Sequence, residues 1–332
     1  MRAALYRQLG DPSVLSVEEI PTPEPGPGQV RVKVVCSGVN PTDWKSRSGR
    51  TAGPPEGFQV PHQDGAGIVD AVGPGVTDRQ PGQRVWVYLA AASNRYGTAA
   101  EYCLVPAERT VPLPDHASFE LGASLGVPAL TAAHCLGGDP AALQGATVLV
   151  AGGAGAVGHA AIELARHAGA RVIATVSTDE KAELARRAGA DAVVFYRAPD
   201  AVEQLRAAAP RVDRIVELAL GANLELDLAV SDAGTTIAVY ANEPTDPVLP
   251  VRRCMTANVT LAFVLLYGVR PAALAAALAW VRRAVDDQAL TTLPLHRYAL
   301  DQVADAQSAV EAGAVGKVLV LPDAEPSSTS SS

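Results

Sequence analysis

Cysteine is scarce in this chain of 332 residues. Its four cysteines, Cys36, Cys103, Cys135 and Cys254, are widely spaced and form no CxxC pair. This spacing excludes both a disulfide framework and the closely spaced cysteines of a structural zinc lobe. Since each lies among apolar residues, we interpret all four as reduced core thiols.

Long hydrophobic runs and basic stretches are also missing. The most apolar stretch, 259–269, is shorter than a membrane span and is flanked by arginines. The N-terminal residues contain no apolar signal-peptide core. The net charge is −8, whereas a nucleic-acid groove needs concentrated Lys and Arg. We therefore expect a cytoplasmic protein with no nucleic acid and no membrane partner, whose substrate is a small molecule.

The residues that are present are typical of a folded enzyme. Hydrophobic residues make up 48% of the chain and charged residues 19%, which is the range of globular proteins. At roughly 100–200 residues per domain, the length predicts two domains. Only the serine-rich end, 323–332, has low complexity, and we predict a disordered tail there.

The first part of the chain, residues 1–120, has short β-type runs separated by Pro and Gly turns. The runs lie at 30–35, 67–72, 84–88 and 100–105. Period-two runs with such turns predict an irregular, mostly antiparallel β domain.

From residue 121 onward, strand and helix patterns alternate. Strands are predicted at 147–151, 171–176, 192–196, 214–218, 235–240 and 259–263, and helices at 157–168 and 179–188. This alternation predicts a doubly wound parallel sheet over 121–266. The last patterns, helices at 271–287 and 303–312 and a strand at 317–321, are expected to return to the first domain over 267–322.

A glycine-rich turn connects the first strand and helix of the second domain. It is the GxGxxG sequence Gly153-Ala154-Gly155-Ala156-Val157-Gly158. The first glycine permits the tight turn, the second lets the backbone approach a pyrophosphate, and the third lets the helix pack on the strand. An ordinary Gly-rich connection is the alternative, but the flanking strand and helix favour a dinucleotide site.

The residue after the second strand indicates which dinucleotide binds. An NAD site usually has Asp or Glu at this position, whereas this chain has Ser177. Ser177 and Thr178 offer hydroxyl groups at a helix start, and Lys181 adds a positive charge one turn later. We therefore predict NADPH as the cofactor. The alternative is that the two hydroxyls only cap the helix and Lys181 is solvated.

Several further segments carry a family resemblance. They are Cys36-Ser37-Gly38-Val39-Asn40-Pro41-Thr42-Asp43, Arg47-Ser48-Gly49, Asp64-Gly65-Ala66-Gly67-Ile68-Val69, Ala100-Glu101-Tyr102, Pro128-Ala129-Leu130-Thr131-Ala132 and Gly316-Lys317-Val318-Leu319-Val320. With the glycine turn, they resemble the zinc-independent quinone oxidoreductases of the medium-chain dehydrogenase/reductase superfamily, which include zeta-crystallin. The resemblance covers nearly the whole chain. It implies an α/β fold with a GroES-like β domain for substrate and a Rossmann doubly wound parallel sheet domain for NADPH.

The resemblance also implies that no zinc is bound. Zinc alcohol dehydrogenases of the superfamily have a catalytic Cys at the position of Asn40, and their His-Glu pair falls on Gln63 and Asp64. His62 is one place away and is a ligand only in another register. An open catalytic zinc site needs three protein ligands, which these positions do not supply. Asp64 is instead expected to pair with Lys317.

By the same resemblance, Asn40 and Thr131 line the nicotinamide end of the cofactor. The alternative is that Asn40 stabilises a turn and Thr131 bonds to its helix backbone. Tyr196, at the end of the third strand, is expected to flank the adenosine phosphate with Lys181. Lys317 matches a basic position near the pyrophosphate.

The proton donor is less defined, because the chain departs from the family pattern. Many members have a substrate-facing tyrosine where this sequence has Lys45 after Trp44. Lys45 and Tyr88 are the candidate catalytic donors, and Asn94 and Tyr96 lie in the loop that follows Tyr88. A solvated Lys45 without a catalytic role is the alternative.

Together these features predict a zinc-free, NADPH-dependent reductase. It would transfer hydride to a quinone or an α,β-unsaturated carbonyl acceptor in a cleft between the two domains. We expect a homodimer formed through the exposed last strand of the sheet. The alternatives are an enoyl-thioester or pathway-dedicated tailoring reductase, or a non-catalytic NADPH-binding protein.

Overall fold

The computed structural model describes residues 1–243 and 245–323. The chain divides into two compact units: unit 1 contains Met1–Val127 and the segment from Pro294 onward, and unit 2 contains Pro128–Leu293. Apart from Asp323, the predicted tail lies outside the described residues. Within these residues no helix is both long and apolar enough to cross a membrane.

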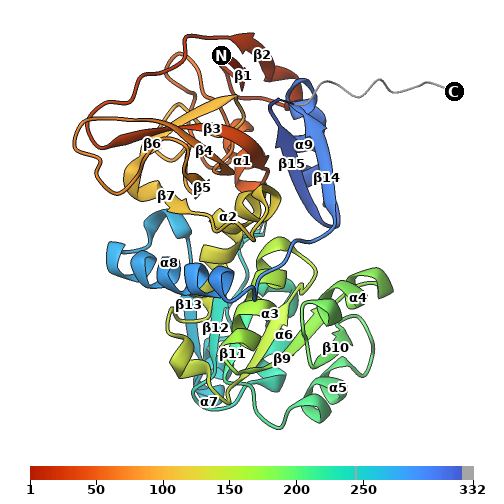
Figure 1. Ribbon diagram of the computed structural model, residues 1–332. Helices are drawn as coiled ribbons and strands as arrows, with labels where there is room; N and C mark the ends of the chain where they lie inside the picture. Colours follow the sequence, from red (N-terminus) through yellow and green to blue (C-terminus); the bar gives the residue numbers. More distant parts are fainter. Residues whose placement is uncertain (244, 324–332) are drawn as a thin grey trace, which may run out of the picture. The chain divides into compact units, whose positions relative to one another are not determined.

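Unit 1 is built on a mostly antiparallel sheet (Figure 1). Its seven strands are β14 (Leu295–Ala299), β15 (Lys317–Leu321), β3 (Gln29–Gly38), β4 (Asp64–Val72), β5 (Arg84–Val87) and β7 (Thr110–Pro112), in that order, with β6 (Tyr102–Pro106) also paired to β3. A separate hairpin joins β1 (Arg2–Leu5) and β2 (Ser16–Glu19). Two helices, α1 (Pro41–Arg47) and α9 (Val303–Glu311), complete this unit and contact each other.

The C-terminal segment is part of the core of unit 1. Strand β15 runs antiparallel to β3, and Val318 and Val320 are buried in one cluster with Leu5 and Val39. Burying each such side chain contributes roughly 1.5–3 kcal/mol, so the end of the chain stabilises the first unit. The sequence prediction started this return at 267, whereas the structure starts it at Pro294.

Unit 2 contains a six-stranded sheet in which all neighbouring strands are parallel. Its order is β10 (Ala192–Phe195), β9 (Arg171–Val176), β8 (Thr147–Ala151), β11 (Arg214–Glu217), β12 (Thr236–Val239) and β13 (Thr260–Phe263). This is the 3-2-1-4-5-6 order of the Rossmann fold. The predicted fold class is confirmed.

The helices of unit 2 follow its strands along the chain. They are α3 (Ala156–His167), α4 (Asp179–Arg187), α5 (Ala201–Ala208), α6 (Leu220–Val230), α7 (Val251–Ala257) and α8 (Pro271–Asp286). Helix α3 contacts α4 and α8, whereas α6 contacts α5 and α7. A further helix, α2 (Phe119–Cys135), crosses the boundary between the two units.

Two buried carboxyl groups lie against each other in unit 2. Glu217 ends β11, accepts hydrogen bonds from the Ala219 backbone and the Asn223 side chain, and is fully buried. Asp227, one turn after Asn223 in α6, is also buried and hydrogen-bonds to Glu217. Burial and the neighbouring Glu217 carboxylate raise the pKa of Asp227 to about 9, so the folded protein keeps this acid protonated at neutral pH.

This pair predicts that stability falls as pH rises. Because the pKa of Asp227 is 3.8 in a model compound and about 9 in the fold, unfolding releases its proton throughout that range. Asp227→Asn keeps a donor toward Glu217 and removes the titration. We expect the variant to melt at higher temperature than the parent, by about 2–4 °C per kcal/mol gained, with a gain that grows toward pH 9. Melting curves across this pH range test it, and a gain independent of pH would contradict the account.

Candidate functional site

The glycine-rich turn lies between β8 and α3, as predicted. Gly152 has a φ of 65°, a left-handed conformation that favours glycine. The Gly153 backbone N–H donates to the Thr175 carbonyl at 3.1 Å, which ties the turn to the end of β9. Gly155 is the N-cap of α3, so the free N–H groups of this helix begin at the turn.

The glycines of the turn face different surroundings. A Cβ on Gly158 would overlap the Gly152 carbonyl oxygen, and one on Gly153 would lie 2.8 Å from the Ala174 Cβ. These two glycines are therefore required by packing. Gly155 differs, because its φ of −77° suits any residue and a Cβ there would meet only the Gly152 oxygen, at 3.4 Å. Nothing within the fold therefore requires glycine at position 155.

The polar residues after β9 lie together. The Lys181 Nζ is 3.3 Å from the Ser177 Oγ, and the Thr178 Oγ1 accepts the Lys181 backbone N–H at 3.3 Å as the N-cap of α4. Thr178 thus has the capping role given above as the alternative. Ser177 and Lys181 present a hydroxyl and an ammonium at the carboxyl end of β9.

Tyr196 lies beside this pair, at the end of the neighbouring strand. Strands β9 and β10 are parallel with Val176 opposite Phe195, and the Tyr196 N–H donates to the Val176 carbonyl at 3.3 Å. The Arg197 guanidinium lies 5.3 Å from the centroid of the Tyr196 ring. The turn, Ser177 and Tyr196 therefore follow three adjacent strands along one edge of the sheet.

Asn40 occupies a buried cluster in unit 1. Its side-chain nitrogen donates to the Asp64 carboxylate at 2.6 Å, and its side-chain oxygen accepts from the Lys317 ammonium at 2.8 Å. Its backbone N–H donates to Asp43 at 2.7 Å. The amide thus lies between an acid and a base, and it retains one uncommitted N–H hydrogen in this set of bonds.

Charges in this cluster are compensated within the chain. Lys317 is 2% exposed and also donates to the Val39 carbonyl. Burial lowers the pKa of Lys317, while it raises the pKa of Asp43 to about 8 and that of Asp64 to about 6. The Lys317 ammonium makes two hydrogen bonds inside unit 1 and is linked to Asp64 through Asn40. Its predicted place near the pyrophosphate stays a prediction.

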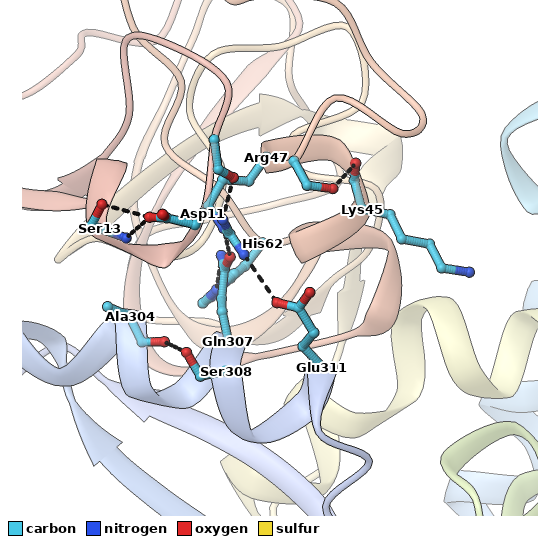
Figure 2. Close-up of polar contacts among 11 residues, drawn as sticks. Asp11, Ser13, Lys45, Arg47, His62, Ala304, Gln307, Ser308 and Glu311 are labelled. Carbon is cyan, nitrogen blue, oxygen red and sulfur yellow. Dashed lines mark hydrogen bonds and ion pairs between the residues drawn. The ribbon is translucent and has the colours of Figure 1, made fainter. Parts of the chain in front are cut away.

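Arg47, the last residue of helix α1, connects this helix to α9. This guanidinium is fully buried and donates to Gln307 of α9 at 2.7 Å, and it lies 3.5 Å from Glu311 (Figure 2). Gln307 in turn contacts His62. Figure 2 shows the side chain of Lys45 pointing away from this cluster.

The predicted catalytic donors have different surroundings. The Lys45 Nζ lies 5.9 Å from the centroid of the Trp44 ring, and burial lowers its pKa. The Tyr88 hydroxyl donates to the Glu108 carbonyl at 2.8 Å, and burial raises its pKa to about 12. Because that bond uses the only hydroxyl proton, the structure speaks against Tyr88 as the donor. Thr131 is buried in α2 and belongs to unit 2.

Comparison with known proteins identifies the family. A zinc-binding dehydrogenase model matches residues 156–283, and an alcohol dehydrogenase GroES-like domain model matches 26–115. The quinone oxidoreductase of Lama guanicoe is 32% identical, over 97% of this chain and 97% of its own. The chain belongs to the quinone oxidoreductase family. It is therefore an oxidoreductase of the medium-chain dehydrogenase/reductase superfamily.

Two solved structures of this superfamily resemble the chain closely. A mycobacterial protein complexed with NADPH is 33% identical, with a TM-score of 0.83, over 97% of this chain and 100% of its own. An NAD-dependent alcohol dehydrogenase is 27% identical, with a TM-score of 0.87 and the same coverage. These two relatives use different dinucleotides, so cofactor choice depends on residues of this chain.

One of the two matching family models is named for zinc, but the residues of this chain do not fit a zinc ion. In residues 1–243 and 245–323, no three His, Cys, Asp or Glu side chains form a group that could hold a metal ion. His62 bonds to the Ser37 hydroxyl at 2.9 Å, and burial and Lys317 lower its pKa to about 3. A cation bound at Asp64 would meet the Lys317 ammonium, which bonds to the same amide as Asp64 does.

Sequence reasoning missed several residues of the two clusters. Asp43 was not expected to contribute, although its position three residues after Asn40 has the spacing of a capping box. Arg47 and Gln307 were also missed, and no local pattern marks them, because they are 260 positions apart. Arg197 was also missed. Its signal was available, since it directly follows the strand-end Tyr196.

Substitution of two glycines in this turn is predicted to have different effects, one on NADPH binding and the other on stability. Gly155→Val places a side chain where the pyrophosphate would approach, so we expect NADPH affinity to fall at least about 100-fold, or ~2.7 kcal/mol. We expect the melting temperature to change little, because position 155 is open in the fold. Fluorescence titration with NADPH and a thermal melt measure the two effects.

Gly158→Ala is the matched control for this experiment. Its Cβ would overlap the Gly152 carbonyl oxygen, so this variant is expected to lose stability, whereas Gly155→Val loses binding. Unchanged NADPH affinity in a folded Gly155→Val protein would show that the turn does not hold the cofactor.

Proposed function

We propose that this protein is an NADPH-dependent reductase that transfers hydride to a quinone or to an α,β-unsaturated carbonyl compound. The observation that carries this proposal is the edge of the unit 2 sheet. There an open glycine turn precedes a Ser177–Lys181 pair at the position where an NAD site usually has an acid. The mycobacterial relative complexed with NADPH supports the same choice.

Each part of this edge has a separate task in binding. The backbone around Gly155 and the N-terminus of α3 would hold the pyrophosphate. Ser177, Lys181 and Tyr196 would surround the adenosine phosphate. When bound, NADPH supplies a hydride to the acceptor. The chain itself must then orient the acceptor and stabilise the negative charge that develops on its oxygen.

Hydrogen-bond donors are the means available for that stabilisation. The remaining N–H hydrogen of Asn40 is oriented, because Asp64 and Lys317 fix the plane of the amide. Such preorganised donors stabilise an oxyanion without reorganisation. We propose that Asn40 and the Thr131 hydroxyl serve the nicotinamide end of the cofactor. The proton for the α-carbon of an enone would come from solvent or from Lys45.

The experiment is an assay of NADPH oxidation with a panel of acceptors. A simple benzoquinone, an enone and an enoyl thioester are each mixed with protein and with NADPH or NADH. We expect turnover with the quinone or the enone, and a kcat/KM for NADPH at least about tenfold above that for NADH, or ~1.4 kcal/mol. Equal use of the two cofactors would refute the cofactor assignment.

The same panel separates the alternative functions. Turnover confined to the enoyl thioester would indicate an enoyl-thioester reductase. Tight NADPH binding with no turnover of any acceptor would favour a non-catalytic NADPH-binding protein.

We also propose that the protein forms a homodimer through β13. This strand is an edge of the unit 2 sheet, and edge strands pair readily with another chain. Large apolar side chains are exposed on and near it: Val251, Met255, Phe263, Leu265 and Tyr267. Phe263 and Leu265 are 69% and 68% exposed. Several exposed apolar side chains on neighbouring positions, unlike a single one, indicate an interaction surface.

A charge on this edge should therefore break the dimer. Phe263→Glu is expected to shift the mass measured by light scattering from about twice the chain mass to the chain mass. Ile68→Glu is the control, because Ile68 is also an exposed apolar residue but lies on β4 in unit 1. A parent protein that is already monomeric would contradict the proposal.

A further inference from the structure

We propose that Arg197 is a specificity-determining residue that binds the 2′-phosphate of NADPH together with Lys181. This inference rests on the proposed function and deepens it, because it names a second cation for that phosphate. It is carried by the positions of Lys181, in the first turn of α4 and bonded to Ser177 after β9, and of Arg197, which follows the adjacent strand β10.

The two cations approach the same edge of the sheet. Lys181 is held near the end of β9 by the Ser177 hydroxyl, at 3.3 Å. Arg197 follows Tyr196, whose N–H donates to Val176, the last residue of β9. Neighbouring strands are separated by about 4.8 Å, so the residues that follow them are close neighbours. The Lys181 ammonium and the backbone of Arg197 therefore lie near the position directly after β9, where a Rossmann fold binds the adenosine ribose.

The charges on this edge explain why one cation is not enough. A phosphate monoester carries roughly −1.5 to −2 charges at neutral pH. The N-terminus of α4 would attract an anion, but Asp179 and Glu180 occupy its first turn and oppose one. The attraction must then come from side-chain cations, and Lys181 with Arg197 matches the charge of the phosphate.

Tyr196 gives Arg197 a defined place. The guanidinium lies 5.3 Å from the ring centroid, within the range of a cation–π contact. A stacked guanidinium keeps its N–H groups at its edge, where they can donate in pairs to phosphate oxygens. A flexible, solvated arginine would lose more conformational entropy on binding. Tyr196, which was predicted to flank the phosphate with Lys181, would thus also orient Arg197.

The test uses two nucleotides that differ only in this phosphate. Binding of 2′,5′-ADP and of 5′-AMP is measured by calorimetry for the full chain and for Arg197→Ala, Arg197→Lys and Lys181→Ala. We expect Arg197→Ala to weaken 2′,5′-ADP at least about tenfold and 5′-AMP less than about twofold. Arg197→Lys should retain an intermediate affinity, since it keeps the charge and loses the paired donors.

Arg187→Ala is the matched control for net charge. Arg187 lies exposed on α4 and pairs with Glu183 at 3.0 Å, so its loss changes the protein charge by the same amount without touching the strand edge. This variant should bind both nucleotides like the parent. A thermal melt of each variant confirms that it is folded.

The outcomes separate this inference from the proposed function. If Arg197→Ala binds 2′,5′-ADP like the parent while Lys181→Ala does not, Arg197 has no role and the NADPH assignment stands. If the parent protein binds 2′,5′-ADP no better than 5′-AMP, the NADPH assignment and this inference both fail. A loss in Arg187→Ala equal to that in Arg197→Ala would reduce the effect to general electrostatics and overturn the inference.

Discussion

The ammonium group of Lys317 is the constraint on which the arrangement of unit 1 depends. A buried charge without partners costs several kcal/mol, so its partners must stay in place. Lys317 lies on β15 and bonds to Asn40 and to the Val39 carbonyl, while Asn40 bonds to Asp64 on β4. Asp64 also accepts the Val127 N–H. This set fixes the last strand, the start of α1 and the middle of α2 at Val127 relative to one another.

The same cluster accounts for the chemistry that this unit can offer. Positions 40, 63 and 64, where zinc dehydrogenases place ligands, hold Asn, Gln and Asp here. Lys317 supplies a positive charge covalently fixed to the chain, and Asp64, which is linked to it through Asn40, balances that charge. An amide oriented by such partners is a preorganised hydrogen-bond donor. The proposed activation of a carbonyl acceptor therefore relies on amide and hydroxyl groups.

The candidate site in unit 2 is organised differently, because it is built from chain segments that follow successive strands. The turn after β8, Ser177 after β9 and Tyr196 after β10 lie in strand order along one edge. Each residue is placed by its own strand end, so few long-range contacts are needed. Under the proposed function, single substitutions at these ends would change cofactor selection without disturbing the sheet. Two solved relatives with this fold, one NAD-dependent and one complexed with NADPH, are consistent with that.

The fold class, the glycine turn and the polar residues Ser177 and Lys181 after the second strand could be predicted from the amino-acid sequence. All three depend on local rules: the period of hydrophobic residues, the space that glycine leaves, and the position that follows a strand of the sheet. The 17-residue helix α2 escaped this reasoning, because Pro128 inside it removes a backbone donor and interrupts the helical pattern.

Which buried polar residues bond to each other could be seen only in the folded chain. Lys317 and Asn40 are 277 positions apart, and Arg47 and Gln307 are 260 apart. Tyr88, expected as a donor, bonds to a backbone carbonyl on a neighbouring segment. A buried polar group takes whichever partner the folded backbone brings within hydrogen-bond reach, and no periodicity along the chain encodes that choice. Local backbone geometry can therefore be predicted from this sequence, whereas its buried polar networks depend on contacts that exist only in the folded chain.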